Sequence, residues 1–293
     1  MKPKPPFLMT KTEVEKTEEN RMKISIITVV YNQRVYIADA IESVLAQDYP
    51  DIEYIIVEGK STDGTMDVIE PYRARIEKRN GKIVSEADKG LYDALNKGIL
   101  LATGDYVGFV HADDVLYDKN VISRVVEHIK KTGCDVFYGD GIFTPAENIY
   151  VVIRDWISGS YSKTKVKWGW LPLHPTMYIR RQTYLENGLY DASYDTAGDT
   201  ELLIRYLYNK SLKVAYLHSY IIRMRLGGKS TSIWNSQKIW REDVRAYHTN
   251  GLSSLAIIGK RLSKIQQFVC HRSFYGYYWR KVKRHFFKWF TKK

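Results

Sequence analysis

The chain has 293 residues, of which 44 % are hydrophobic and 27 % are charged. This length and composition predict one large globular domain, or a domain with an appendage, and exclude a disordered tail protein or a collagen-like fibre. Two cysteines, Cys134 and Cys270, are too few for a disulfide framework or a cysteine-rich zinc site, so a reducing cytosol is expected. The sequence shows no apolar run of about 18 residues and no signal-peptide pattern, so neither a membrane span nor export is expected.

The formal net charge of +12 is concentrated near the C-terminal end. Residues 251–293 contain eleven Lys or Arg and no Asp or Glu, whereas residues 1–250 hold 34 basic and 33 acidic residues. The body is therefore nearly neutral. The positive charge is therefore informative about the binding partner of the C-terminal segment and says little about the ligand of the body.

Strands and helices alternate in the first half of the chain. The β-branched run Ile24–Val30 predicts a strand buried on both faces, and apolar residues at helical spacing predict a helix over 37–45. The same patterns predict, in order, a strand at 52–57, a helix at 65–77, a short strand at 82–85, a helix at 91–102 and a strand at 106–110. This alternation is typical of an α/β fold with a mostly parallel central sheet flanked by helices.

The pattern changes after about residue 135. Short strand-like runs at 136–138, 149–153 and 177–179 are mixed with aromatic residues, and one amphipathic helix begins near Gly198. We expect this half to complete a pocket that the first half begins, because open α/β sheets bind ligands at the carboxyl ends of their strands.

Acidic loops follow three of the predicted strands. Taken singly, each is typical of a solvated turn, but together they place acids along one edge of the sheet. They are Glu58 with 61–64, 86–90 and 111–114. The adjacent carboxylates Asp113 and Asp114 repel each other unless a cation neutralises them. Oxygen ligands favour Mg²⁺ or Mn²⁺, held by one or two carboxylates and substrate phosphates.

With these loops the chain resembles glycosyltransferase family 2, in its bacterial branch that builds exopolysaccharide, capsule or O-antigen repeat units. Five ordered blocks carry the resemblance: 26–32, 61–65, 85–98, 102–105 and 112–114. It implies a GT-A nucleotide-diphosphosugar transferase fold across 23–230, with a nucleotide-binding half at 23–130 and an acceptor half at 131–230. The expected flanks are a flexible segment at 1–22 and a helical, basic and aromatic extension at 231–293.

The resemblance implies roles for residues at the matching positions. Thr28, Tyr31 and Glu58 would hold the nucleoside, and Asp88 is the acid of the third loop. Asp114 would bind Mn²⁺ or Mg²⁺ directly, with Asp113 reaching the ribose or metal-bound water. Glu58 departs from the Asp usual in the family, which leaves the preferred base open.

The second half should supply a catalytic base. Asp199 opens the helix near 198, where a helix-capping role is the alternative, because acids in a first turn stabilise the helix dipole. The resemblance favours Asp199 as the base, since the acid that opens this helix is the family's base. Glu201 is the second candidate.

Four further residues are candidates for the acceptor or diphosphate side of the pocket. They are His174, Trp170, Arg225 and Lys229. For His174 a core or surface position is the alternative, and for Trp170 it is simple packing.

The combined prediction is an inverting, metal-dependent glycosyltransferase. It would move a hexose or N-acetylhexosamine from a UDP-sugar to a saccharide acceptor, which we expect to be lipid-linked, at the cytoplasmic face of the membrane. One alternative is a GDP- or dTDP-sugar donor on the same fold, and another is a non-catalytic protein that binds anions or nucleic acid. Aromatic and basic residues at helical spacing between 274 and 290 predict a tail that lies on an anionic membrane surface, with packing on the catalytic domain as the alternative.

Overall fold

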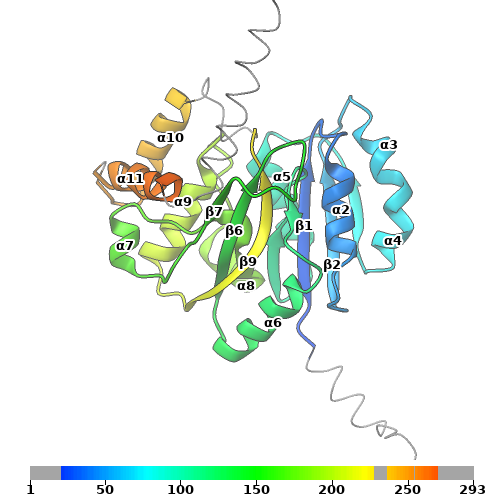
Figure 1. Ribbon diagram of the computed structural model, residues 1–293, viewed down its shortest axis with the longest axis horizontal. Coiled ribbons are helices and arrows are strands. Elements are labelled where there is room, and N and C mark those ends of the chain that lie inside the picture. Colours follow the sequence, from blue (N-terminus) through cyan, green and yellow to red (C-terminus); the bar gives the residue numbers. More distant parts are fainter. Residues whose placement is uncertain (1–20, 228–235, 254, 270–293) are drawn as a thin grey trace, which may run out of the picture.

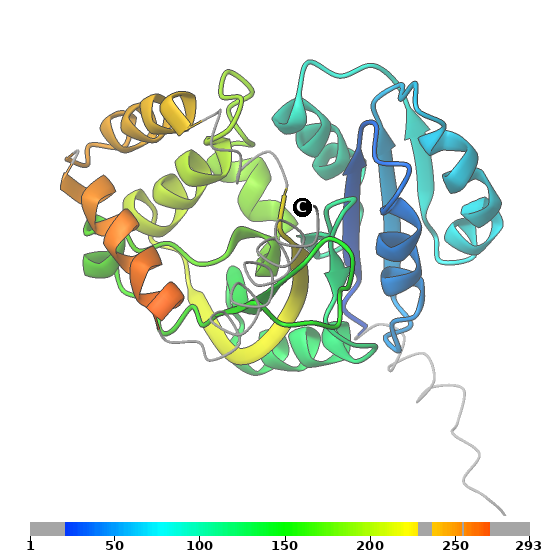
Figure 2. The same ribbon diagram turned by 45° about the horizontal axis from the view of Figure 1, so that its top comes forward.

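The centre of the protein is a mixed β-sheet with helices on both faces (Figure 1). The computed structural model describes residues 21–227, 236–253 and 255–269. Over these residues the sheet has nine strands in the order β3-β2-β1-β4-β8-β6-β9-β5, with β7 paired to β6 at the side. The sheet curls strongly through β9, so its two halves wrap around the middle of the molecule (Figure 2).

The first half of the sheet is parallel, as the sequence predicts. Its strands are β1 (Ile24–Val30), β2 (Ile52–Glu58), β3 (Lys82–Ser85) and β4 (Tyr106–Phe109). Every residue of β1 and β2 is buried, because helices cover both faces. Parallel pairing brings the carboxyl ends of these four strands to one edge.

The second half is mixed, so the sheet as a whole is less parallel than predicted. Its strands are β5 (Val115–Leu116), β6 (Val136–Thr144), β7 (Arg154–Trp156), β8 (Tyr178–Arg180) and β9 (Val214–Arg225). β6 runs parallel to β9, while β8 runs antiparallel to β4 and β6. β5 and β7 pair antiparallel with β9 and β6, respectively.

Helices form a layer on each face of the sheet. One apolar cluster packs α2 (Ile37–Leu45), α3 (Thr65–Ile69), α4 (Arg73–Glu77) and α6 (Val121–Thr132) against one face. The other cluster holds α5 (Leu91–Leu101), α7 (Lys163–Lys167), α8 (Arg181–Asn187) and α9 (Gly198–Ile204), the last continued by a π-helical turn, η3 (Arg205–Asn209). Two single 3-10 turns, η1 (Glu70–Tyr72) and η2 (His174–Thr176), complete the elements of this part of the chain.

Three local predictions need correction. The helix expected at 65–77 is divided into α3, η1 and α4, because Pro71 has no N–H to continue the α-helical hydrogen bonds. The run 149–153 is not a strand; the strand here is β7, which begins at Arg154. The long strand β9 was not predicted, because it mixes tyrosine, histidine and arginine with aliphatic residues, which breaks the apolar alternation.

The described C-terminal helices pack on α9, in the second half of the chain. α10 (Ser236–Thr249) and α11 (Leu255–Val269) meet α9 in a small core of Ile204, Tyr247, Leu252, Ala256 and Ile257. The flexible segment predicted at 1–22 falls almost wholly outside the described residues, and so do the aromatic positions predicted to form a membrane-bound tail at 274–290. Among the helices that the structure describes, none is both long and apolar enough to cross a bilayer.

We expect Gly108→Ala to destabilise the fold at the junction of the two halves of the sheet. A methyl group there would lie 2.4 Å from Cε1 of Tyr178, a fully buried side chain on β8. Overpacking of this kind costs about 1–3 kcal/mol. Urea denaturation measures the loss, and the double variant with Tyr178→Leu should lose less than the sum of the two single changes. Strict additivity would contradict the steric explanation.

Candidate active site

Three loops converge where the parallel strands end. Val30 of β1 is paired with Glu58 of β2, and Glu58 is paired with Ser85 of β3. The residues that follow these positions therefore share one edge of the sheet. His111, Asp113 and Asp114 follow β4 at the same edge. The structure thus brings together the acidic loops that the sequence analysis expected to meet.

The 61–65 motif holds two of these loops together. Ser61 Oγ, Asp63 Oδ2 and Thr65 Oγ1 accept hydrogen bonds from the backbone N–H groups of residues 32, 34 and 33, at 2.9–3.1 Å. In return, the side-chain oxygen of Asn32 accepts from the N–H of Thr62. These hydrogen bonds fix the shape of the two loops. The side-chain oxygens that accept them are already bonded to backbone N–H groups.

Glu58 is buried and ionised at this edge. Its carboxylate accepts hydrogen bonds from Ser61 N–H at 2.5 Å and from the Ser85 hydroxyl at 2.6 Å. Burial acts to raise the pKa of Glu58, but these hydrogen bonds outweigh it and hold the pKa below its ordinary value. The charge of Glu58 is therefore stable at neutral pH.

Tyr31 and Asp88 flank Gly59, directly after Glu58. A Cβ at Gly59 would lie 2.5 Å from Oδ2 of Asp88 and 3.4 Å from Cδ2 of Tyr31, so only glycine allows this approach. The Tyr31 side chain is 56 % exposed, which leaves much of its ring open to solvent. The three predicted residues Tyr31, Glu58 and Asp88 are thus neighbours.

Arg225, at the end of β9, contacts the two aspartates that follow β4 more than 100 residues earlier in the sequence. Its backbone N–H donates to Asp114 Oδ1 at 3.2 Å, and its Nη1 donates to the Asp113 carbonyl at 2.7 Å. Its Nη2 pairs with Asp39 on α2, and its guanidinium lies 4.6 Å from the Tyr36 ring centre. Arg225, a candidate for the acceptor or diphosphate side, therefore lies beside Asp114, and its two terminal nitrogens already donate to protein groups.

The surroundings of Asp114 stabilise its charged form poorly. Burial and the neighbouring charge of Asp113 raise the pKa of Asp114 well above its ordinary value, against the opposing effect of Arg225. A divalent cation would relieve both effects, and two carboxylates supply the hard oxygen donors that Mg²⁺ or Mn²⁺ prefers. No cluster of three or more potential ligands occurs in the described part of the chain, so a cation here would need further oxygens from a substrate.

Asp199 faces this edge from the start of α9. The Tyr92 hydroxyl on α5 donates to Asp199 Oδ1 at 3.4 Å, and the same oxygen accepts from Thr200 N–H at 2.7 Å. A Cβ at Gly198 would lie 2.8 Å from the Tyr92 ring, so glycine is needed for this contact. The carboxylate is partly exposed, unlike that of Glu201.

Two neutral histidines lie between the carboxylate groups. His174 Nε2 and the Tyr190 hydroxyl are hydrogen-bonded at 2.6 Å, and burial lowers the pKa of His174 to about 4. Desolvation also lowers the pKa of His111, whose ring centre is 6.2 Å from that of His174. Both imidazoles are therefore uncharged at neutral pH.

His111 shows that the two halves of the chain form one site. The charges of both Asp113 and Asp199 act on its imidazole, opposing the desolvation. Asp113 follows β4, whereas Asp199 is 86 residues later on α9. The structure thus places the predicted base within electrostatic range of the predicted metal site.

Three predicted residues do not point into this site. Thr28 is fully buried within β1, and its hydroxyl is hydrogen-bonded to that of Tyr54 at 3.0 Å. Glu201 is buried and paired with Arg205, which in turn holds the carbonyls of 187–189. Trp170 packs edge-on against Tyr138, and its indole N–H donates to the Ser158 carbonyl. Each has a structural role here, and Lys229 lies outside the described residues.

Other residues of the site were missed in the sequence. Tyr92 lies within the 85–98 motif and His111 within the 111–114 loop, so a signal for both existed, whereas Tyr190 has no local signal. Glu242 on α10 is the clearest case. Its carboxylate accepts hydrogen bonds from the N–H groups of residues 195, 196 and 197 and from the Thr196 hydroxyl, at 2.7–3.2 Å. It thereby fixes the turn that presents Asp199.

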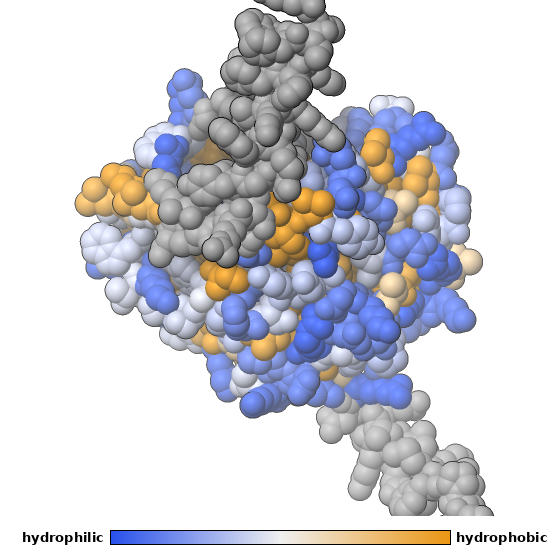
Figure 3. All heavy atoms as spheres, in the orientation of Figure 1, coloured by the Kyte–Doolittle hydropathy of each residue, from blue (hydrophilic) through white to orange (hydrophobic). Residues whose placement is uncertain are grey.

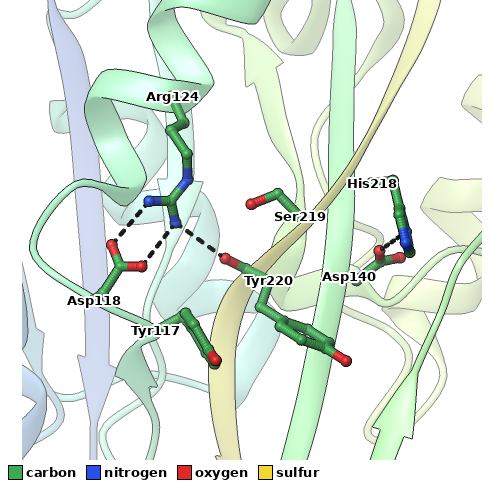
Figure 4. A pocket seen from close by; sticks show the side chains of 7 residues that line it. All are labelled: Tyr117, Asp118, Arg124, Asp140, His218, Ser219 and Tyr220. Carbon is green, nitrogen blue, oxygen red and sulfur yellow. Dashed lines mark hydrogen bonds and ion pairs between the residues drawn. The ribbon is translucent and has the colours of Figure 1, made fainter.

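A separate cavity of about 330 Å³ lies beside β6, β9 and α6 (Figure 4). Arg124 pairs there with Asp118 and donates to the Tyr220 carbonyl, while His218 Nδ1 lies 2.8 Å from Asp140 Oδ2. Burial raises the pKa of Asp140. The charged groups pair mainly with one another, and none of the predicted site residues lines this cavity.

Comparison with known proteins identifies the family. The model of glycosyl transferase family 2 matches residues 25–198, which include every acidic loop of the site and end beside Asp199. The chain belongs to this family. It is therefore a glycosyltransferase, as the resemblance in the sequence implied.

Two relatives in the family illustrate the extent of the similarity. A PGL/p-HBAD biosynthesis glycosyltransferase of Mycobacterium bovis is 28 % identical over 219 residues, which cover 74 % of this chain and 82 % of the relative. TuaG, a glycosyltransferase assigned to teichuronic acid biosynthesis in Bacillus subtilis, is 38 % identical over 111 residues, or 38 % of this chain and 43 % of TuaG.

Solved structures of other glycosyltransferases share the GT-A type of α/β fold. Residues 1–349 of S. aureus TarS, in complex with UDP-GlcNAc, align with a TM-score of 0.61 and 19 % identity, covering 86 % of this chain and 74 % of that one. The match spans 44 % of a longer TarS structure. The mannosyltransferase PcManGT of Pyrobaculum calidifontis, in complex with GDP-Man and Mn²⁺, aligns with a TM-score of 0.57 and 17 % identity, covering 77 % of this chain and 65 % of PcManGT.

We expect Glu242→Ala to loosen the turn before Asp199. Hydrogen bonds to a charged acceptor contribute about 1.5–3 kcal/mol each, so the amides of residues 195–197 should exchange hydrogen at least about tenfold faster. Hydrogen exchange read by mass spectrometry measures this. The matched control is Glu127→Ala, an exposed glutamate on α6. Unchanged exchange at 195–197 would show that Glu242 does not hold the turn.

Proposed function

We propose that the protein is an inverting, metal-dependent member of the family in cell-surface polysaccharide synthesis. It moves a hexose or N-acetylhexosamine from a UDP-sugar to a saccharide acceptor, which is lipid-linked and presented at an anionic membrane surface. The observation that supports this proposal is that the charges of Asp113 and Asp199 both act on His111, because an inverting transfer needs a base close to the group that holds the diphosphate.

The donor nucleotide fits the cleft at the carboxyl ends of β1–β3. The open ring of Tyr31 offers a stacking surface for a base, and the ionised Glu58 accepts hydrogen bonds from a base N–H. Asp88, which flanks Gly59 opposite Tyr31, is placed for the nucleoside as well. The TarS complex with UDP-GlcNAc supports a UDP-sugar, whereas the PcManGT complex keeps a GDP-sugar as the alternative.

Asp113 and Asp114 are the residues that would hold Mn²⁺ or Mg²⁺. Their donor set fits such a cation, and a neighbour of the same fold is known with Mn²⁺. When bound, the cation supplies positive charge that stabilises the departing nucleoside diphosphate. Arg225 keeps Asp114 in place through its N–H.

Asp199 acts as the general base. It accepts the proton of the acceptor hydroxyl as that oxygen attacks the anomeric carbon, and the bond from the anomeric carbon to the diphosphate breaks on the opposite side. Tyr92 donates to Asp199 and orients it. The neutral His174 and His111 border the sugar position without competing for the proton.

We expect Asp199→Asn to lower sugar transfer by about 10²–10⁴-fold while donor binding persists, because a positioned base contributes about that factor. Steady-state transfer and calorimetric UDP binding measure the two properties. Asp195→Asn is the matched control, since this exposed carboxylate belongs to the same turn and pairs with Lys238. Wild-type transfer in the Asp199 variant would restrict Asp199 to a helix-capping role.

We expect Asp114→Asn to abolish Mn²⁺-dependent binding of UDP while leaving the fold intact. The change removes a buried charge and keeps an oxygen that can accept from Arg225 N–H, so the melting temperature without metal should not fall. Calorimetry with UDP, GDP and dTDP, with and without Mn²⁺, measures affinity and base preference together. Asp67→Asn, at an exposed position on α3, is the control. Normal turnover of the Asp114 variant in EDTA would refute the metal site.

A further inference from the structure

One face of α11 is apolar and exposed. Leu255, Ile258 and Leu262 are 61 %, 51 % and 59 % exposed, and their spacing places them on one side of the helix. The opposite side buries Ala256 and Ile257 against α9 and α10. In Figure 3 this hydrophobic surface is visible at the left edge, over α11. We call Leu255, Ile258 and Leu262 the apolar stripe.

A cationic groove lies next to the apolar stripe. It has a volume of about 450 Å³ and is lined by Gln237, Trp240, Arg241 and Arg261. The Arg261 guanidinium lies 4.3 Å from the Trp240 ring centre, which holds it beside the groove. In the described part of the chain, neither arginine forms an ion pair with an acid.

The two acids of α10 are engaged by neighbouring parts of the protein. On α10, Glu242 binds the turn at 195–197, and Asp243 accepts a hydrogen bond from Lys260 Nζ at 2.7 Å. Residues 255–269 contain no acid at all. The surface formed by the groove and the stripe is therefore both positive and apolar.

We propose that this α10–α11 face binds an anionic phospholipid bilayer. The arginine groove accepts headgroup phosphates, and the apolar stripe enters the interfacial layer, as in helices that lie in the plane of a membrane. Charge complementarity commits the surface to this occupant, because Arg241 and Arg261 line the groove and the described residues 255–269 of α11 contain no acid. The inference deepens the proposed function, on which it rests for the membrane-linked acceptor.

On α11, the Lys260 side chain connects this surface to α9. Lys260 extends from α11 to Thr200 Oγ1 at 2.9 Å, and Thr200 follows Asp199 on α9. A bilayer on the α10–α11 face is therefore mechanically linked to the helix that carries the base.

The test is sedimentation of the full chain with vesicles of phosphatidylcholine containing phosphatidylglycerol, compared with pure phosphatidylcholine. Leu262→Glu combined with Ile258→Glu should reduce partitioning to the anionic vesicles roughly ten- to hundredfold. Leu100→Glu is the matched control, since Leu100 is 58 % exposed, almost the same as Leu262, but lies on α5. It should sediment like the wild type.

A second pair of variants tests the groove. Arg241→Gln with Arg261→Gln should weaken binding to anionic vesicles and reduce its salt dependence, whereas Arg73→Gln, which removes one charge from α4, should do neither. Wild-type sedimentation of the stripe variant would overturn the proposal. A second outcome would also overturn it. If the wild type is a dimer, and the stripe substitutions dissociate this dimer without changing sedimentation with vesicles, the face joins two copies of the chain instead.

Donor hydrolysis in solution separates this proposal from the proposed function. Hydrolysis of UDP-sugar by the stripe variant at the wild-type rate, with loss of vesicle binding, supports both. The wild type could instead fail to bind or hydrolyse any nucleotide-sugar while its vesicle binding still depends on Leu262. This result would contradict the proposed function and support the membrane-binding surface.

Discussion

Arg225 joins the two halves of the sheet, and the geometry of the carboxylate pair Asp113 and Asp114 depends on it. The residue ends β9, yet its backbone and side chain bind Asp114, the Asp113 carbonyl and Asp39. A buried carboxylate beside another carboxylate is costly unless opposing charge and donors lie close by. Arg225 supplies part of both, so the arrangement of the loop after β4 depends on the late strand β9.

A second set of polar contacts fixes the position of Asp199. Glu242 and Lys260, from the two C-terminal helices, bind the turn before α9 and its first residues. Tyr92 approaches from the first half, and Gly198 leaves room for its ring. Asp199, the proposed base, is thus held from three directions, which favours a defined orientation over a mobile loop. The described C-terminal helices therefore help to position this carboxylate.

Much of the first half was predictable because its signals are local. The apolar runs of β1, β2 and β4 and the apolar faces of α2 and α5 agree with the expected ranges to within about one residue. The acids that end these strands had to share an edge once the strands were parallel, so the grouping of Glu58, Asp88 and Asp113 followed. In the second half, β9 mixes tyrosine, histidine and arginine with aliphatic residues, and pattern alone did not identify it.

The sequence alone determined the family, the α/β class and the set of acids at one edge, because short-range periodicity and motif order encode them. Tertiary structure decided which of several similar side chains enters the site. Glu201 lies two residues from Asp199, about 200° further around the helix, and pairs with Arg205 instead. Thr28 lies within β1 and is enclosed with Tyr54, whereas Tyr31 has just left the strand and is open. Such choices depend on which neighbour each side chain meets, and those neighbours come from distant parts of the chain.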